Sequence, residues 1–267
     1  MGFTAFSWGF IDVYWYGIST AAAVICALIV SWAAVRRSGE AFAPVVDIAL
    51  WGIPSAFIMA RIVYVAAQWQ HFSGHPLSAL AVWNGGLSIY GAVGGFLLAG
   101  VIYLKMHNLN TWHWLDLMAP GMAAALTVLQ LTNFIMQLTV GSPLPADMPN
   151  DHRLAEYIEF YYRPSGFEDY LYFKPVALYQ AGAQFIVFAV LCILWPVRCR
   201  RPKMMADGTL FLLMAFALSA VRFGFGFMYL SPDNDVWLSA VQWISLAGML
   251  GVVIVYIYKR WRSALGK

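Results

Sequence analysis

The sequence predicts an all-α polytopic membrane protein with seven transmembrane helices. Of its 267 residues, 61% are hydrophobic and 11% are charged, and the mean hydropathy is +0.68. A soluble domain usually carries about 25% charged residues. Several apolar runs also reach the roughly 20 residues that a helix needs to cross a bilayer. Composition and run length together exclude an ordinary soluble domain.

Seven apolar runs give the predicted spans in chain order. An aromatic, uncharged segment at residues 1–11 precedes them and suits a short arm at the membrane interface. Charged or turn-forming residues separate the spans, for example Arg36 and Arg37 after the first. The predicted spans are residues 12–35, 44–67, 81–104, 116–138, 175–197, 208–230 and 236–258.

The distribution of basic residues predicts the orientation. Most lysines and arginines near span ends fall on one side, which the positive-inside rule assigns to the cytoplasm. With seven spans, the N-terminus is then outside and the C-terminus is cytoplasmic. The residues behind this prediction are Arg36, Arg37, Lys105, Arg198, Arg200, Arg201, Lys203, Lys259, Arg260, Arg262 and Lys267.

The longest polar segment, about residues 139–173, is predicted to be an external head inserted into a single membrane domain, residues 1–267. Its eight aromatic residues are too many for a disordered tract. We expect it to be ordered, with one helix near residues 151–162.

Residues 82–95 form the most glycine-rich stretch of the chain, which we expect at the head of the third span. Ser88, Gly91 and Gly95 recur at i, i+3 and i+7 and share one helix face. Small residues on such a face let two membrane helices approach closely. The alternative is that a ligand lies against the exposed backbone. The glycines are Gly85, Gly86, Gly91, Gly94 and Gly95.

Two arginines, Arg61 and Arg222, lie within the outer halves of apolar spans. A charge inside the membrane is costly and needs a partner or a water-filled cavity. Asp47 and Asp116 lie at the cytoplasmic span ends and are poor partners for Arg61. We expect the two arginines to hold one anionic lipid phosphate together, because guanidinium binds phosphate through two hydrogen bonds. The alternative is that each arginine snorkels to the interface or binds helix-end carbonyls.

The fourth span carries a neutral polar stripe, formed by Thr127, Gln130, Asn133 and Gln137. These residues cover about a third of the helix circumference, so they are expected to face the bundle. Hydrogen bonding between helices is the favoured interpretation, because amides do not transfer protons at neutral pH.

No motif indicates a metal or another cofactor, and we predict none. Cys26, Cys192 and Cys199 have no metal-binding or disulfide spacing. The predicted partners are the membrane itself and an anionic phospholipid, and no nucleic acid.

Ten short segments, spread over nearly the whole chain, resemble the phosphatidylglycerol–prolipoprotein diacylglyceryl transferases of the bacterial inner membrane. They are Y-W-Y-G-I at 14–18, Asp47, A-R-I-V-Y at 60–64, W-N-G-G-L-S at 83–88, D-L-M-A-P at 116–120, N-F-I at 133–135, P-V-A-L-Y at 175–179, G-T-L-F at 208–211, V-R-F at 221–223 and Q-W-I-S-L at 242–246. The resemblance implies an inner-membrane enzyme that moves diacylglycerol from phosphatidylglycerol to the cysteine thiol of a lipoprotein precursor.

The ionisable positions of that family are mostly replaced here. The family has a histidine after G-G-L-S, a signature like G-R-x-G-N-F-x-N-x-E, an H-P-x-Q-L-Y-E box, and an arginine followed four residues later by glutamate. In this chain the corresponding residues are Tyr90 for the histidine, Gln130, Met136 and Leu138 in the signature, Gln180 at the end of the box, and Gly226 after Arg222.

Two functions therefore remain open. The favoured one is a catalytically degenerate family member that keeps a phospholipid pocket and serves as a lipid-binding or accessory subunit of a membrane complex. The alternative is an active, divergent transferase that uses Tyr90 and Arg222. A transporter function is less favoured, because the sequence shows no internal repeat and no chain of acidic residues through the spans. The predicted phospholipid-binding residues are Arg61, Tyr64, Gly85, Gly86, Ser88, Gln130, Asn133, Tyr179 and Arg222.

Overall fold

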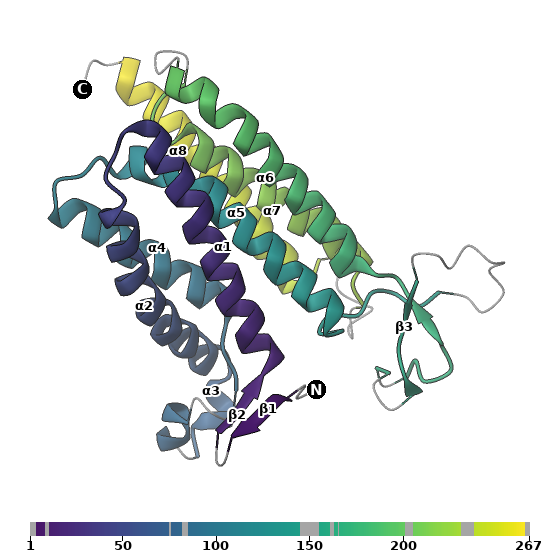
Figure 1. Cartoon of the computed structure of the whole chain (residues 1–267). Coiled ribbons are helices and arrows are strands. Elements are labelled where there is room, and N and C mark those ends of the chain that lie inside the picture. The colour runs from purple at the N-terminus through teal and green to yellow at the C-terminus, as the bar shows by residue number, and fades with distance from the viewer. Residues whose placement is uncertain are drawn as a thin grey trace. The chain divides into compact units, whose positions relative to one another are not determined.

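The computed structural model confirms a mostly helical protein with seven helices long and apolar enough to span a membrane (Figure 1). It describes residues 4–8, 11–74, 76–81, 85–144, 155–160, 163–164, 166–200, 205–230 and 238–264. The seven helices are α1 (Trp15–Ser38), α2 (Ala43–Ala67), α4 (Ile89–Met106), α5 (Thr111–Ile135), α6 (Val176–Arg200), α7 (Thr209–Phe225) and α8 (Ala240–Ala264). The predicted orientation of the termini stays a prediction.

Contacts divide the chain into two compact units. One unit comprises residues 32–117, and the other comprises residues 1–31 and 118–267. The first contains α2, the short helix α3 (Trp69–Phe72), the 3-10 helix η1 (Pro76–Leu80) and α4. The second contains most of α5 together with α6, α7 and α8. The single membrane domain stays a prediction.

The third span begins later than predicted, at Ile89 and not at residue 81. Gly85 and Gly86 have φ of +79° and +80°, a left-handed conformation that cannot continue a helix. They belong to the loop before α4, so their predicted place in the helix is wrong. Ser88 caps α4, and its Oγ accepts a hydrogen bond from the Gly91 N–H at 3.5 Å.

Helix α4 packs against α2 through the glycine face. A methyl group placed on Gly91 would lie 2.5 Å from the Met59 carbonyl oxygen, and one on Gly95 would lie 2.6 Å from that of Ser55. Both glycines are buried. The packing interpretation of this face is therefore confirmed, since only glycine permits so close an approach.

Two small antiparallel sheets were missed from sequence. The N-terminal aromatic arm forms β1 (Thr4–Trp8) and β2 (Ile11–Tyr14), which pair with each other. In the head, β3 (Glu156–Tyr157) pairs with β4 (Tyr172–Phe173).

The helix predicted near residues 151–162 is wrong for its described part, residues 155–160. Glu156 pairs with Phe173 across the sheet, and both Phe173 and Ile158 are fully buried. An extended backbone places these side chains in the core of the head. The rest of that predicted helix lies outside the described residues.

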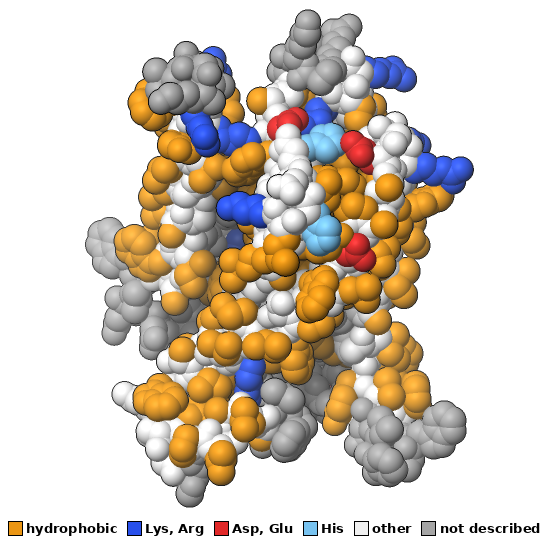
Figure 2. All heavy atoms as spheres, turned by 90° about the vertical axis from the view of Figure 1, so that its left-hand side faces the viewer, with side chains coloured by type: hydrophobic (Ala, Val, Ile, Leu, Met, Phe, Trp, Pro, Cys, Tyr) orange, Lys and Arg blue, Asp and Glu red, His pale blue; other side chains and the backbone are white. Residues whose placement is uncertain are grey.

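Hydrophobic side chains are spread widely over the face shown in Figure 2. Ile186 on α6 and Ile254 on α8 are 64% and 65% exposed. Such exposure on helices of this length is typical of lipid-facing surfaces and not of a soluble domain.

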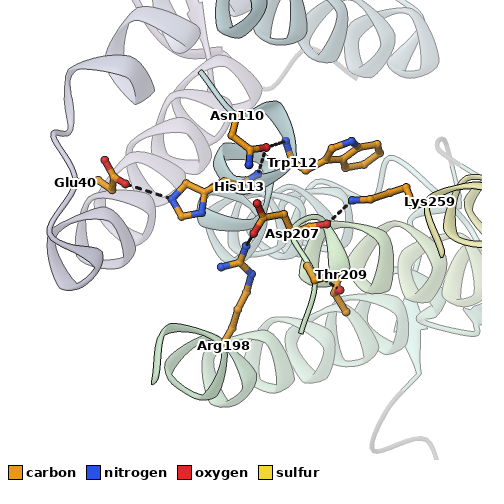
Figure 3. Close-up of polar contacts among 9 residues, drawn as sticks. Glu40, Asn110, Trp112, His113, Arg198, Asp207, Thr209 and Lys259 are labelled. Carbon is orange, nitrogen blue, oxygen red and sulfur yellow. Dashed lines mark hydrogen bonds and ion pairs between the residues drawn. The ribbon is translucent and has the colours of Figure 1, made fainter. Parts of the chain in front are cut away.

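Polar contacts gather at helix ends within each unit (Figure 3). In the larger unit, Arg198 Nη2 donates to Asp207 Oδ1 at 2.5 Å, and Lys259 Nζ donates to the Asp207 carbonyl oxygen. Asp207 thus connects the ends of α6 and α8 to the turn before α7. In the smaller unit, His113 Nε2 lies 3.4 Å from Glu40 Oε1.

Candidate functional site

A polar cluster forms inside the larger unit where α5, α6 and the end of α7 meet. Its centre is Gln180 Oε1, which is fully buried on α6. That oxygen accepts hydrogen bonds from Tyr229 Oη at 2.6 Å, Arg222 Nη1 at 3.1 Å and Gln130 Nε2 at 3.3 Å. Three elements distant in sequence therefore converge on one amide oxygen.

Gln130 extends the cluster along α5. Its Nε2 also lies 3.2 Å from Tyr229 Oη, while its Oε1 accepts from Asn133 Nδ2 at 3.2 Å. The favoured interpretation of the polar stripe, hydrogen bonding between helices, is confirmed for Gln130. The other stripe residues act elsewhere: Thr127 bonds the Ala123 carbonyl, and Gln137 bonds the Tyr157 carbonyl in the head.

Arg222 supplies the charge of this cluster. Its guanidinium lies over the Tyr229 ring, 5.2 Å from the centroid, and Nη1 is also 3.4 Å from Tyr229 Oη. Within the described residues it forms no ion pair, so its positive charge is not neutralised there. A half-buried cation of this kind can bind an anion at modest desolvation cost.

Tyr229 was not predicted as a site residue. It follows the 3-10 helix η5 (Gly226–Met228), which continues from α7. Tyr229 is also bridged to Gly141 at the start of the head. Its spacing of seven residues from Arg222 is the signal in the sequence, because i and i+7 share a helix face. The helix end between them hides that signal.

Arg61 occupies a different setting in the smaller unit. It is 8% exposed, and its five N–H groups donate to five backbone carbonyl oxygens. The acceptors are Ala79 at 2.7 Å, Gly85 at 2.5 Å, Gly86 at 3.0 Å, and Ser78 and Ala81 at 3.2 Å each. This geometry favours the alternative in which Arg61 binds carbonyls and holds the loop between α3 and α4.

Tyr64 supports the same loop. The guanidinium of Arg61 lies 5.7 Å from the Tyr64 ring centroid and 5.5 Å from that of Phe72. A methyl group on Gly86 would lie 2.3 Å from the Tyr64 ring, so the loop backbone contacts that ring directly. Five predicted lipid-binding residues thus come together, in an arrangement that organises a loop. Their lipid contact stays a prediction: Arg61, Tyr64, Gly85, Gly86 and Ser88.

Tyr90 and Tyr179 lie beside these features without polar contacts among the described residues. Tyr90 is in the first turn of α4 and is 38% exposed. Tyr179 is half-buried on α6, one residue before Gln180. A proton-accepting role for Tyr90 would need an activating group, and the described part of the chain places none beside it. The catalytic role of Tyr90 stays a prediction.

Among the described residues of the head, Glu156 is a buried carboxylate. Glu156 is 5% exposed, and neither oxygen has a hydrogen-bond partner within the described part of the chain. Burial raises the pKa of Glu156 to about 7, because desolvation penalises the charged form.

The fold and the polar cluster define a class: a seven-helix membrane protein with an arginine inside the bundle that forms no ion pair with the described residues. Sequence comparison identifies the family within that class. The Prolipoprotein diacylglyceryl transferase family matches residues 4–258. The chain belongs to this family, and it is a multi-pass protein of the bacterial inner membrane.

Relatives match over nearly their whole length. The phosphatidylglycerol–prolipoprotein diacylglyceryl transferase of Lactobacillus delbrueckii subsp. bulgaricus is 31% identical over 262 residues, covering 96% of this chain and 90% of the relative. That of Lactobacillus johnsonii is 31% identical, with the same coverage. That of Ligilactobacillus salivarius is 29% identical and is covered over 92% of its length.

Proposed function

We propose that this protein transfers diacylglycerol from phosphatidylglycerol to the cysteine thiol of a lipoprotein precursor. The observation that carries the proposal is the hydrogen-bonded cluster around Arg222, in a chain similar along its length to proteins named for that reaction. The favoured interpretation from sequence alone was a degenerate member. The comparisons support activity better, because the chain is similar along nearly its whole length to proteins named for that reaction.

The proposed reaction has a simple balance. The thiol sulfur forms a bond to the glycerol carbon as the bond from that carbon to the phosphate oxygen breaks. The electron pair stays on the phosphate, which leaves as glycerol phosphate, and the thiol proton is transferred to that phosphate. Charge on the leaving phosphate grows during the step, so a fixed cation beside it lowers the barrier. Arg222 has the charge and position for this role.

The replaced residues do not by themselves indicate that catalytic activity has been lost. Gln130 and Gln180 stand where the resemblance implies an arginine and a glutamate, and their side chains contact each other at 3.3 Å. Loss of one partner alone would leave a buried charge unpaired, which is strongly destabilising. Here both positions are neutral and both amides are hydrogen-bonded, so the two replacements leave no unpaired charge at either position.

A second candidate is a lipid-binding or accessory subunit of a membrane complex without transferase activity. Gly226, in place of the family's glutamate, and the exposed Tyr90, in place of its histidine, favour this candidate. Gly226 has no side chain that could exchange a proton, and a tyrosine at position 90 needs an activating group to act as a base.

A transfer assay separates the two candidates. The purified protein, in nanodiscs with radiolabelled phosphatidylglycerol, is incubated with a lipobox peptide. The proposal expects labelled peptide, and Arg222→Met should lower the rate by about 10²–10³-fold. Arg262→Met, which removes an exposed arginine on α8, is the matched control and should retain the parent rate. No labelled peptide from well-folded protein would favour the accessory role.

A further inference from the structure

Gln242 opens α8 with an amide whose orientation is fixed. Its Oε1 accepts from the Ser239 backbone N–H at 2.8 Å and from Ser239 Oγ at 3.1 Å. In return, the Gln242 backbone N–H donates to Ser239 Oγ at 3.4 Å. This reciprocal pattern is a capping box. Because a backbone N–H can only donate, the atom facing it is the amide oxygen, and Nε2 is the free end.

The free end is a buried donor without a partner. Gln242 is 3% exposed, and Nε2 has no hydrogen-bond partner in the described part of the chain. Buried amide donors are nearly always hydrogen-bonded. A donor without a partner loses its hydration on burial and gains no hydrogen bond in return. An orphan donor held in place by a helix cap therefore indicates an acceptor from outside the described part of the chain.

The donor lies against the end of α7 that carries Arg222. Arg222 and Gly226 are four residues apart, so they share one face of α7, and Gly226 keeps helical dihedrals of −54° and −29°. A methyl group on Gly226 would lie 2.6 Å from Gln242 Cγ and 3.1 Å from Nε2. The face that bears the uncompensated guanidinium is thus the face that Gln242 packs against.

Gly226 is what allows this approach. The resemblance implies a glutamate at this position, and a side chain there would require the Gln242 side chain to shift from its observed position. With glycine, the site loses a negative charge, and a neutral donor lies against the backbone one helical turn from Arg222. Both changes favour an anion whose oxygens accept hydrogen bonds.

We propose that Gln242 Nε2 and Arg222 bind one phosphate group together, with Gln242 donating to a phosphate oxygen. The proposal names a residue of the site assigned above and rests on that proposed function for the identity of the lipid. The chemistry suits the phosphodiester of a lipid headgroup and the phosphate of released glycerol phosphate alike. Gln242 is in this view a binding residue, and its capping bonds set its direction.

Two variants separate binding from capping. Gln242→Glu keeps an oxygen for the Ser239 N–H but replaces the donor with a negative oxygen. Ser239→Ala removes the hydroxyl of the capping box and leaves the donor of Gln242 in place. The full-length protein is titrated in detergent with phosphatidylglycerol, glycerol phosphate or inorganic phosphate, and binding is followed by native mass spectrometry. Thermal stability is measured in parallel.

We expect Gln242→Glu to weaken phosphatidylglycerol binding by about tenfold or more, and Ser239→Ala to lower stability while its affinity stays at the parent value. Weakened binding of the lipid alone assigns the donor to the headgroup, whereas equal weakening with the free phosphates assigns it to the phosphate itself; both support the proposal. Parental affinity in Gln242→Glu would overturn it and leave Gln242 as a capping residue only. Because binding is the readout, an inactive protein with this pattern would refute the transferase function and keep the inference.

Discussion

Gln130 Nε2 lies 3.3 Å from Gln180 Oε1, and the same oxygen accepts from Arg222 at 3.1 Å. Two residues that the sequence marks as departures from the family are therefore partners in space. Their environments differ in one respect: Gln180 contacts the cation directly through its oxygen, whereas Gln130 reaches it only through shared partners. That difference makes the two positions respond differently to a restored charge.

Restoring the charges one at a time should give unequal effects. Gln130→Arg puts a second buried cation near Arg222 without an anion, and we expect a loss of about 3–5 kcal/mol in the free energy of unfolding. Gln180→Glu places a carboxylate on Arg222, so stability should be largely kept while anionic lipid binding falls. The double variant should recover most of the stability that Gln130→Arg loses. Thermal unfolding and lipid content of the four proteins give the test, and additive losses would contradict the pairing.

Substitution of the two intramembrane arginines should have different effects on stability and on lipid content. Arg61→Met removes donors from five backbone carbonyls, so we expect destabilisation by several kcal/mol or failure to fold. Arg222→Met should fold and lose co-purified anionic phospholipid. The sequence alone predicts that both variants lose lipid, with the two arginines on one phosphate. A well-folded Arg61→Met protein with depleted lipid would support that joint site.

The helices were predictable because a bilayer imposes a long apolar run on each of them. The predicted helix boundaries are wrong where local backbone geometry determines where a helix begins. Gly85 and Gly86 have positive φ, so the helix of the third span begins only after them, at Ile89. The helix predicted near residues 151–162 of the head is wrong for a related reason. Glu156 and Ile158 both point inward from an extended segment that is too short to show a strand pattern in the sequence.

The sequence predicts the charged residue of the candidate site, but it does not predict the contacts around that residue. Arg222 stands out in an apolar run, and Gln130 with Asn133 follow from helical spacing. Gln180, Tyr229 and Gln242 come from three other segments, and only the packing of α5, α6, α7 and α8 shows what they meet. Arg61, like Arg222, is a charged residue in an apolar run. Its N–H groups, however, donate to the backbone carbonyls of a loop that follows it in the chain.

The glycine face of α4 gives a direct test of the packing. Gly91→Val would place side-chain atoms into the Met59 carbonyl on α2, so we expect a loss at the upper end of the roughly 1–3 kcal/mol that overpacking costs. Gly94 lies on the same helix with open space around it, and Gly94→Ala should be neutral or stabilising. Thermal unfolding in one detergent compares the two variants. Equal melting temperatures would contradict the close approach of α2 and α4.

The stability of the head should fall as pH rises toward neutrality. The pKa of Glu156 is raised from 4.5 to about 7 by burial, so the folded head holds a proton that the unfolded chain has released. Between about pH 4.5 and 7 the folded state binds more protons, and its stability falls with increasing pH until the curve flattens above pH 7. Glu156→Gln keeps the shape without the charge, so it should remove this pH dependence and stabilise the head at pH 8.

Glu168 is the matched control for that measurement. It is exposed in the same head, and the Gly166 N–H that donates to its carboxylate lowers its pKa. Its contribution is therefore present above its unfolded pKa and is lost as pH falls through its folded pKa, opposite to that of Glu156. Glu168→Gln should leave the slope between pH 4.5 and 7 in place. Limited proteolysis of the head in nanodiscs, at several pH values, follows both variants. A parent head equally resistant from pH 5 to pH 8 would mean that Glu156 is ionised in the fold and has a partner.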